Sequence, residues 1–291
     1  MSWCPSAWAA ESGAAASIPE APNAITVLLA NLPHGVVHDF LHAWENVIFA
    51  WVIAIALAAG LASLSRRPSL IPQRRQNFAE WIVEWFESAF ISDLGPQTRH
   101  FLPFLGTLFL YILALNWAVL LPGLKSPTGG LILDGSAILS GGFVITAALA
   151  VSVFGYVQYT AIRTQGVVRY LHHLMGSPMT AGEWVLCLMT LAPVTHILGE
   201  LVRPISLALR LFGNVTGDDI LLGVFFVLGV LALQATHLPI GVPLHLLIVP
   251  LVLLFGFVQA MIFTWLTSAY LKLALPHEEH HAVHEHTTGG A

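Results

Sequence analysis

Five long apolar segments constrain this chain more than any other feature of its sequence. A helix needs about 20 apolar residues to cross the ~30 Å hydrocarbon core of a bilayer, and each segment is at least that long. Only 9% of the residues are charged, against about 25% in soluble domains. The sequence therefore predicts an all-α integral membrane protein with about five membrane-embedded helices. The segments are 43–64, 101–122, 138–162, 184–233 and 243–275.

These segments divide the chain into three expected parts. Residues 1–40 form an N-terminal leader and outer surface segment, 41–275 a membrane domain, and 276–291 a His/Glu-rich cytoplasmic tail. The leader lacks the basic region and compact apolar core of a secretory signal. No arginine precedes Arg66, which argues against an organellar transit peptide and favours the bacterial cell inner membrane. Cys4 and Cys187 form no disulfide or thiol-site pattern.

The stretch "QNFAEWIVEWFESAF" between the first two spans has helical apolar periodicity. Its glutamates, Glu80, Glu84 and Glu87, lie away from the apolar positions. This pattern predicts an amphipathic helix on the membrane interface, although a helix packed on another subunit has the same pattern. The apolar positions are Phe78, Trp81, Ile82, Trp85, Phe86, Ala89 and Phe90.

Basic residues in the loops predict the orientation of the chain. Two loops are flanked by arginines, whereas loop 123–137 has only Lys125 and loop 234–242 has no basic residue. Because basic loops stay in the cytoplasm, we expect the N-terminus outside and the C-terminus inside. The arginines are Arg66, Arg67, Arg74 and Arg75 around the first loop, and Arg163 and Arg169 around the second.

The fourth apolar segment is unusually long and unusually polar. About 50 residues of helix would run ~75 Å, so either Pro204 breaks the helix or the helix is strongly tilted. With 243–275 it predicts a long tilted helical hairpin. Lipid would not tolerate its polar residues, whereas a water path or a polar partner would. They are Thr195, His196, Glu200, Arg203, Ser206, Arg210, Asn214, Thr216, Asp218 and Asp219.

Arg210 is the most demanding of these residues. An arginine at bilayer depth costs roughly 2.5–3.5 kcal/mol on insertion scales, and it does not escape the cost by deprotonating. A salt bridge to Asp218 or Asp219 is the local alternative, but they lie beyond the usual i, i+4 spacing. We therefore expect a carboxylate from another chain. Asn214 lies one turn further on, and Gln259 in the last span can bridge to Asn214 or to a water.

Polar residues flank the arginine on both sides. Asp218 and Asp219 follow it toward the expected outer surface, and Glu200 and His196 precede it toward the inner one. Two half-paths separated by one fixed charge are typical of an ion-translocating device.

Two stretches, "ELVRPISLALRLFGNVTGDD" and "VQAMIFTWLTSAYL", resemble subunit a of F-type ATP synthases, as does "PFLGTLFLYILALNWAVLLPGLKSPTG". The resemblance runs from about residue 40 to 275. It implies that Arg210 is the essential arginine facing the carboxylate of the rotating c-ring. Asn214 and Gln259 match the polar residues beside it. Asp219 matches the outer half-channel, whereas Glu200, His196 and Ser206 fall on the inner side.

The chain also departs from this family pattern on the outer side. Many members carry His or Glu seven residues before the glutamine, where this chain has Val252. His245, another seven residues earlier, is a candidate replacement as a proton carrier. Asp218 is an acid that the pattern does not require.

The resemblance implies a stator that catalyses no covalent chemistry and needs no cofactor or metal. Its partners would be the c-ring, the peripheral stalk subunit b, the lipid bilayer and protons, with no role for nucleic acid. Proton and sodium both stay open as the transported ion, because the ring's own site should select between them.

Two other functions deserve a test. The tail contains His277, Glu278 and His281 in a literal HEEHH, the zinc-ligand spacing of metalloproteases, but it follows Pro276 with no scaffold around it. A secondary transporter would also line a path with polar residues. Such folds usually contain internal repeats, and none is found between the two halves.

Overall fold

The structure is a computed structural model that describes residues 36–65, 74–95, 98–121, 127–128, 141–167, 192–236 and 244–275. Within these ranges the chain is helical and contains no strand. The tail 276–291, with its HEEHH, most of the leader and most loop residues lie outside them. The described elements are α2 (Val36–Ser65), α3 (Arg74–Leu94), α4 (Thr98–Trp117), the 3₁₀ turn η3 (Ala118–Leu120), α5 (Gly141–Gln165), α8 (Ala192–Thr236) and α9 (Leu244–Ala274).

Five of these helices are long and apolar enough to cross a bilayer. Each coincides with one of the five predicted segments, so the prediction of an all-α membrane protein is confirmed. The membrane-length stretches are Trp44–Ser63, Thr98–Leu120, Gly142–Gln165, Leu198–Gly229 and Leu246–Ala274.

Glycines in the left-handed region end two helices. Gly95, with φ 57°, follows α3, and Gly166, with φ 81°, follows α5. The Gly166 N–H donates to the carbonyl of Ile162 at 2.9 Å, which satisfies a carbonyl that the helix end would leave unpaired. The third span therefore continues past its predicted last residue, 162, as far as Gln165.

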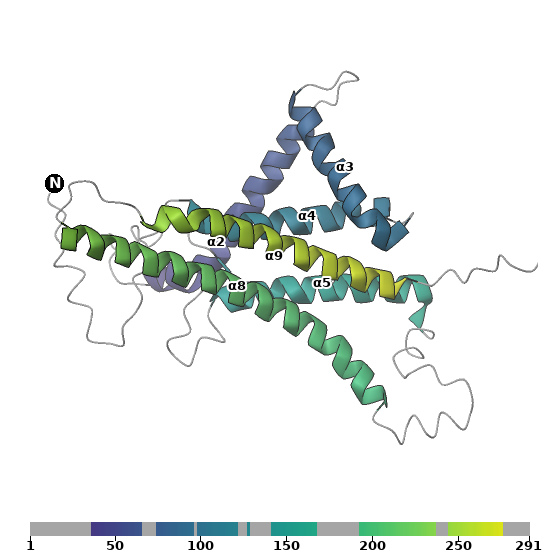
Figure 1. Ribbon diagram of the computed structural model, residues 1–291. Coiled ribbons are helices and arrows are strands. Elements are labelled where there is room, and N and C mark those ends of the chain that lie inside the picture. Colours follow the sequence, from purple (N-terminus) through teal and green to yellow (C-terminus); the bar gives the residue numbers. More distant parts are fainter. Residues whose placement is uncertain are drawn as a thin grey trace, which may run out of the picture.

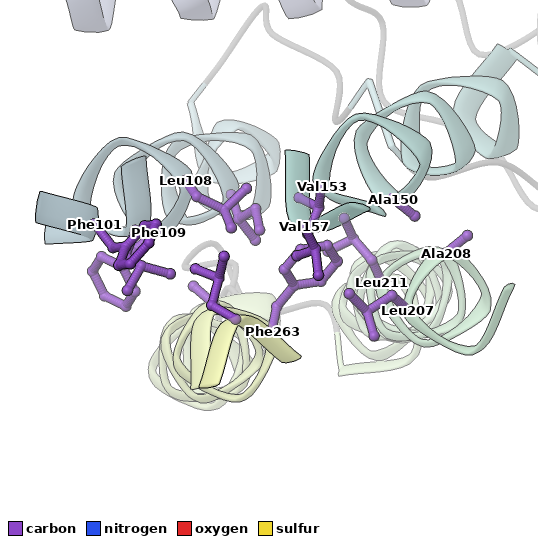
Figure 2. Packing of buried hydrophobic residues seen from close by; sticks show 14 of the residues in the cluster. Phe101, Leu108, Phe109, Ala150, Val153, Val157, Leu207, Ala208, Leu211 and Phe263 are labelled. Carbon is purple, nitrogen blue, oxygen red and sulfur yellow. The ribbon is translucent and has the colours of Figure 1, made fainter. Parts of the chain in front are cut away.

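Helices α4, α5, α8 and α9 run side by side, and α2 and α3 form an inverted V that meets them (Figure 1). Side chains of the four helices converge on one core, in which Phe263 projects from α9 toward Val157 and Leu211 (Figure 2). Leu105, Ile112 and Leu211 are 0% exposed. Because lipid is as apolar as these side chains, the core stabilises the bundle through van der Waals packing.

The outer faces of the spans are apolar as well. Only 17–39% of the residues in the apolar window that defines each membrane-length stretch are buried inside the chain. Trp51, Ile55, Val151 and Leu247 are more than 60% exposed. Exposed apolar surface on this scale does not suit water, and it fits the hydrocarbon of a bilayer.

Helix α8 continues through Pro204 without a break. Its 45 residues correspond to about 67 Å of helix. Of the two predicted alternatives, a helix broken at Pro204 is wrong. Pro204 still removes the N–H that would bond the backbone carbonyl of Glu200. Helix α8 lies against α9 over part of its length and diverges toward its start (Figure 1).

Helix α3 confirms the predicted helix at 76–90, although its apolar face is shared between core and surface. Phe86 is buried in the main core, with Trp85 packed against it, while Phe78 and Trp81 remain exposed. Arg99 of α4 donates from Nε to Oε1 of a glutamate in α3, Glu87, at 2.6 Å. The position of α3 on the membrane interface stays a prediction.

Candidate functional site

Arg210 lies on an exposed face of α8. Ser206, Gly213 and Gly217 are exposed on the same face, and helical geometry puts the four residues within about 60° around the axis. A Cβ added to either glycine would meet nothing within 4 Å. The space beside Arg210 is therefore open in this chain, and small residues of this kind let another helix approach closely.

No acidic side chain in the described part of the chain forms an ion pair with Arg210. The local alternative considered above, a salt bridge to Asp218 or Asp219, is not formed. The guanidinium is thus presented on the surface without a carboxylate from its own described residues.

The polar residues after Arg210 lead from the surface into the bundle. Asn214 Nδ2 donates to Oδ2 of Asp218 at 3.5 Å. Asp218 is 6% exposed, whereas the neighbouring Asp219 is only partly buried. Asn214 therefore connects the neighbourhood of Arg210 with a buried carboxylate about 12 Å along the helix.

Gln259 of α9 is 6% exposed, and its Nε2 has no hydrogen-bond partner among the described residues. Of the two predicted partners of Gln259, Asn214 is not contacted, and the Asn214 amide donates instead to Asp218 along its own helix; the other, a water, stays a prediction. Val252 is 1% exposed and apolar. His245 is the second residue of α9, where the structure describes the helix alone.

A polar cluster lies before Arg210, where α5, α8 and α9 meet. Arg203 Nη1 contacts Oε1 of Glu200 at 2.6 Å, and Gln158 Nε2 of α5 donates to Oε2 of Glu200 at 3.3 Å. The guanidinium carbon of Arg203 lies 5.0 Å from the ring centroid of Tyr270 in α9.

The sequence predicted Glu200 on this side of Arg210, but neither Gln158 nor Tyr270 was among the predicted site residues. A polar side chain inside the third span was the available signal for Gln158. His196 lies near the start of α8, where only the helix is described.

A second interhelical contact, also not predicted, joins α4 to α9 near Gln259. Asn116 Nδ2 donates to the carbonyl of Gly256 at 3.1 Å, and Trp117 Nε1 donates to the carbonyl of Leu253 at 3.2 Å. A Cβ at position 256 would lie 3.1 Å from the Cβ of Asn116. Glycine therefore permits the close approach that holds the Gln259 region of α9 against α4.

Known proteins resemble the chain over most of its length. The family model described as ATP synthase A chain matches residues 47–272. ATP synthase subunit a of Protochlamydia amoebophila is 41% identical over 264 residues, covering 90% of this chain and 91% of the relative. The Moorella thermoacetica subunit a is 32% identical over 229 residues, covering 78% and 89%. Subunit a 1 of Syntrophotalea carbinolica is 34% identical over 253 residues, covering 87% and 92%. The chain belongs to the ATP synthase A chain family.

Proposed function

We propose that the chain is the stator channel subunit of the membrane sector of an F-type ATP synthase. In this role it offers two offset half-channels that pass protons to and from the carboxylates of the c-ring, and Arg210 separates the two. The observation that carries the proposal is the exposed Arg210 on a face of α8 that is open at Gly213 and Gly217.

A permanent positive charge on this face is explained if a negatively charged group of another chain approaches it. Arginine stays protonated at membrane depth, and an unpaired charge there is costly. Arg210 stabilises the ionised form of a nearby carboxylate. A ring carboxylate that arrives protonated therefore releases its proton before it passes Arg210. The same charge repels protons and blocks a leak between the half-channels.

The outer half-channel follows Asp219, Asp218, Asn214 and Gln259, and begins near His245. The hydrogen bond from Asn214 to Asp218 and the unpartnered Nε2 of Gln259 support a wet, polar route here. A buried amide without a partner is costly, and a water or a ring side chain would satisfy it. A proton that crosses this route neutralises the ring carboxylate, which then enters lipid.

The inner half-channel uses Glu200, His196 and Ser206. Glu200 lies ten residues before Arg210, about 15 Å along α8, and is partly exposed. The ring carboxylate releases its proton on this side after nearly a full turn. Each elementary charge that crosses the membrane releases about 2.3 kcal/mol of free energy per 100 mV of membrane potential. Because the leak is blocked, this free energy drives rotation and ATP synthesis.

The partners in this proposal are the c-ring, the peripheral stalk subunit b and the lipid bilayer, with the proton as the transported ion. The chain spans the bacterial inner membrane with its N-terminus outside and its C-terminus in the cytoplasm, as the basic loops predict. The chain itself performs no covalent step.

The decisive experiment replaces Arg210 in the complete complex and measures ATP synthesis in proteoliposomes energised by a pH gradient and a membrane potential. We expect Arg210→Ala to assemble with the c-ring and to lose coupled synthesis. Arg163→Ala is the matched control, because Arg163 is also exposed near one end of a span. Normal synthesis by Arg210→Ala would refute the proposed mechanism.

A further inference from the structure

The cluster around Glu200 gives each carboxylate oxygen its own donor. Oε1 contacts the Arg203 guanidinium at 2.6 Å, and Oε2 accepts from the Gln158 amide at 3.3 Å. The carboxylate is therefore held between α5 and α8 in one orientation. Each oxygen can still accept a further hydrogen bond or a proton.

Arg203 is itself held by a second helix, α9. Its guanidinium carbon lies 5.0 Å from the ring centroid of Tyr270, within the distance at which a cation is attracted to a ring face. The side chains of Arg203 and Glu200 are 31% and 25% exposed. The ion pair is thus partly withdrawn from the surroundings, and three helices fix its geometry.

A cavity of about 10 Å³ adjoins this ion pair, which is close to the volume that one water molecule needs. Its polar lining comes from Glu200, Arg203 and Tyr270, and its other walls are apolar. Pro204 also lines it and leaves the Glu200 carbonyl without its helical donor. The cavity is therefore about large enough for one water molecule beside Glu200.

We propose that Arg203 is a positioning residue, which keeps the Glu200 carboxylate directed at this cavity so that Glu200 passes protons out of the inner half-channel. The proposal rests on the proposed function. Glu200 takes a proton on one oxygen and gives it to the water, and Arg203 stays charged throughout. Without the Arg203 guanidinium, the Glu200 carboxylate loses the 2.6 Å contact that fixes its direction, and it passes protons on more slowly.

The test is a double-mutant cycle on passive proton flux. Membrane vesicles carrying the complex are stripped of the catalytic sector, and a potassium diffusion potential drives protons through the membrane sector. We expect Glu200→Gln and Arg203→Gln each to slow the flux about tenfold, as expected for residues of one ion-pair network. The double variant should be no slower than Glu200→Gln alone, because Arg203 acts through Glu200.

Two further variants separate positioning from folding. Arg203→Lys retains the charge and should restore most of the flux. Gln158→Leu removes the other donor, and it should slow the flux about threefold in the wild-type background but not beside Glu200→Gln. If Arg203→Gln does not assemble, Gln158→Leu with and without Glu200→Gln tests whether the fixed position of the Glu200 carboxylate controls the flux.

Arg163→Gln is the matched control for Arg203. Its guanidinium carbon lies 5.9 Å from the ring centroid of Tyr159, so it shares the contact with a tyrosine, and Nη1 donates to the Tyr159 hydroxyl. The structure records no ion pair of Arg163 with a carboxylate among the described residues. Its replacement should leave the flux unchanged.

Three results would overturn the inference: unchanged flux in Arg203→Gln, unchanged flux in Glu200→Gln, or additive losses in the double variant. The Arg210→Ala measurement keeps this failure distinct from failure of the proposed function. If Arg210→Ala abolishes coupled synthesis while the cycle shows no coupling, the function stands and the role of Arg203 falls.

Discussion

Replacing Gly256 by alanine tests the close contact between α4 and α9. The new Cβ would lie 3.1 Å from the Cβ of Asn116, 3.2 Å from Cδ1 of Trp117 and 3.4 Å from its Nε1. Neither side chain retreats freely, because Asn116 donates to the Gly256 carbonyl and Trp117 to the Leu253 carbonyl. The helices therefore have to separate by a few tenths of an ångström or give up hydrogen-bond geometry.

The expected size follows from three contributions. Overpacking costs about 1–3 kcal/mol, and one weakened hydrogen bond costs about 1 kcal/mol. Alanine in place of glycine stabilises a helix by about 1 kcal/mol, which offsets part of this loss. We therefore expect Gly256→Ala to lower the free energy of unfolding by about 1–3 kcal/mol.

Gly155→Ala is the matched control, since a Cβ there would meet nothing within 4 Å. Gly155→Ala stabilises its helix by about 1 kcal/mol and creates no close contact. The free energies of unfolding of the two variants should therefore differ by about 2–4 kcal/mol. Thermal unfolding of the purified complex in detergent, followed by tryptophan fluorescence, measures the difference. If Gly256→Ala proves as stable as Gly155→Ala, α4 and α9 do not pack as described.

Two further predictions concern the proposed ion path. Gly213→Leu should impair coupled ATP synthesis because it fills the open space beside Arg210, whereas Gly155→Leu should not. If the two variants synthesise ATP equally well, the c-ring does not pack against this face of α8. Asp219→Asn should slow proton entry from the outer side in the same vesicles used for passive flux, and an unchanged rate would remove Asp219 from the path.

The membrane spans were predictable because the signal is local. About 20 consecutive apolar residues decide a span whatever its neighbours are, and the left-handed Gly166 ends α5 close to its predicted limit. Arg210 stood out for a similarly local reason, since a charged side chain at bilayer depth has few structural explanations. Its expected partner, a carboxylate from another chain, stays a prediction.

The contacts between helices were not predictable in the same way. Asn116 and Gly256 are separated by 140 residues. The apolar periodicity around each residue predicts a helix but does not indicate which other helix it contacts. Gln158 joins Glu200 only because α5 packs on α8. The sequence also did not reveal that Asp218, one turn further on, would accept from Asn214; of the two partners expected for Gln259, the structure does not form the contact to Asn214, and the water stays a prediction.

The unbroken length of α8 also bears on the distance between the two proposed half-channels. Its membrane-length stretch has 32 residues, about 48 Å of helix, whereas the hydrocarbon core is about 30 Å thick. A helix that keeps this stretch within the core has to incline by roughly 50°, which displaces its two ends sideways by roughly 35–40 Å. An ion that enters beside one end of α8 therefore cannot leave beside the other by moving straight across the membrane. In the proposed mechanism it therefore needs a carrier that moves sideways, and the turning ring would be such a carrier.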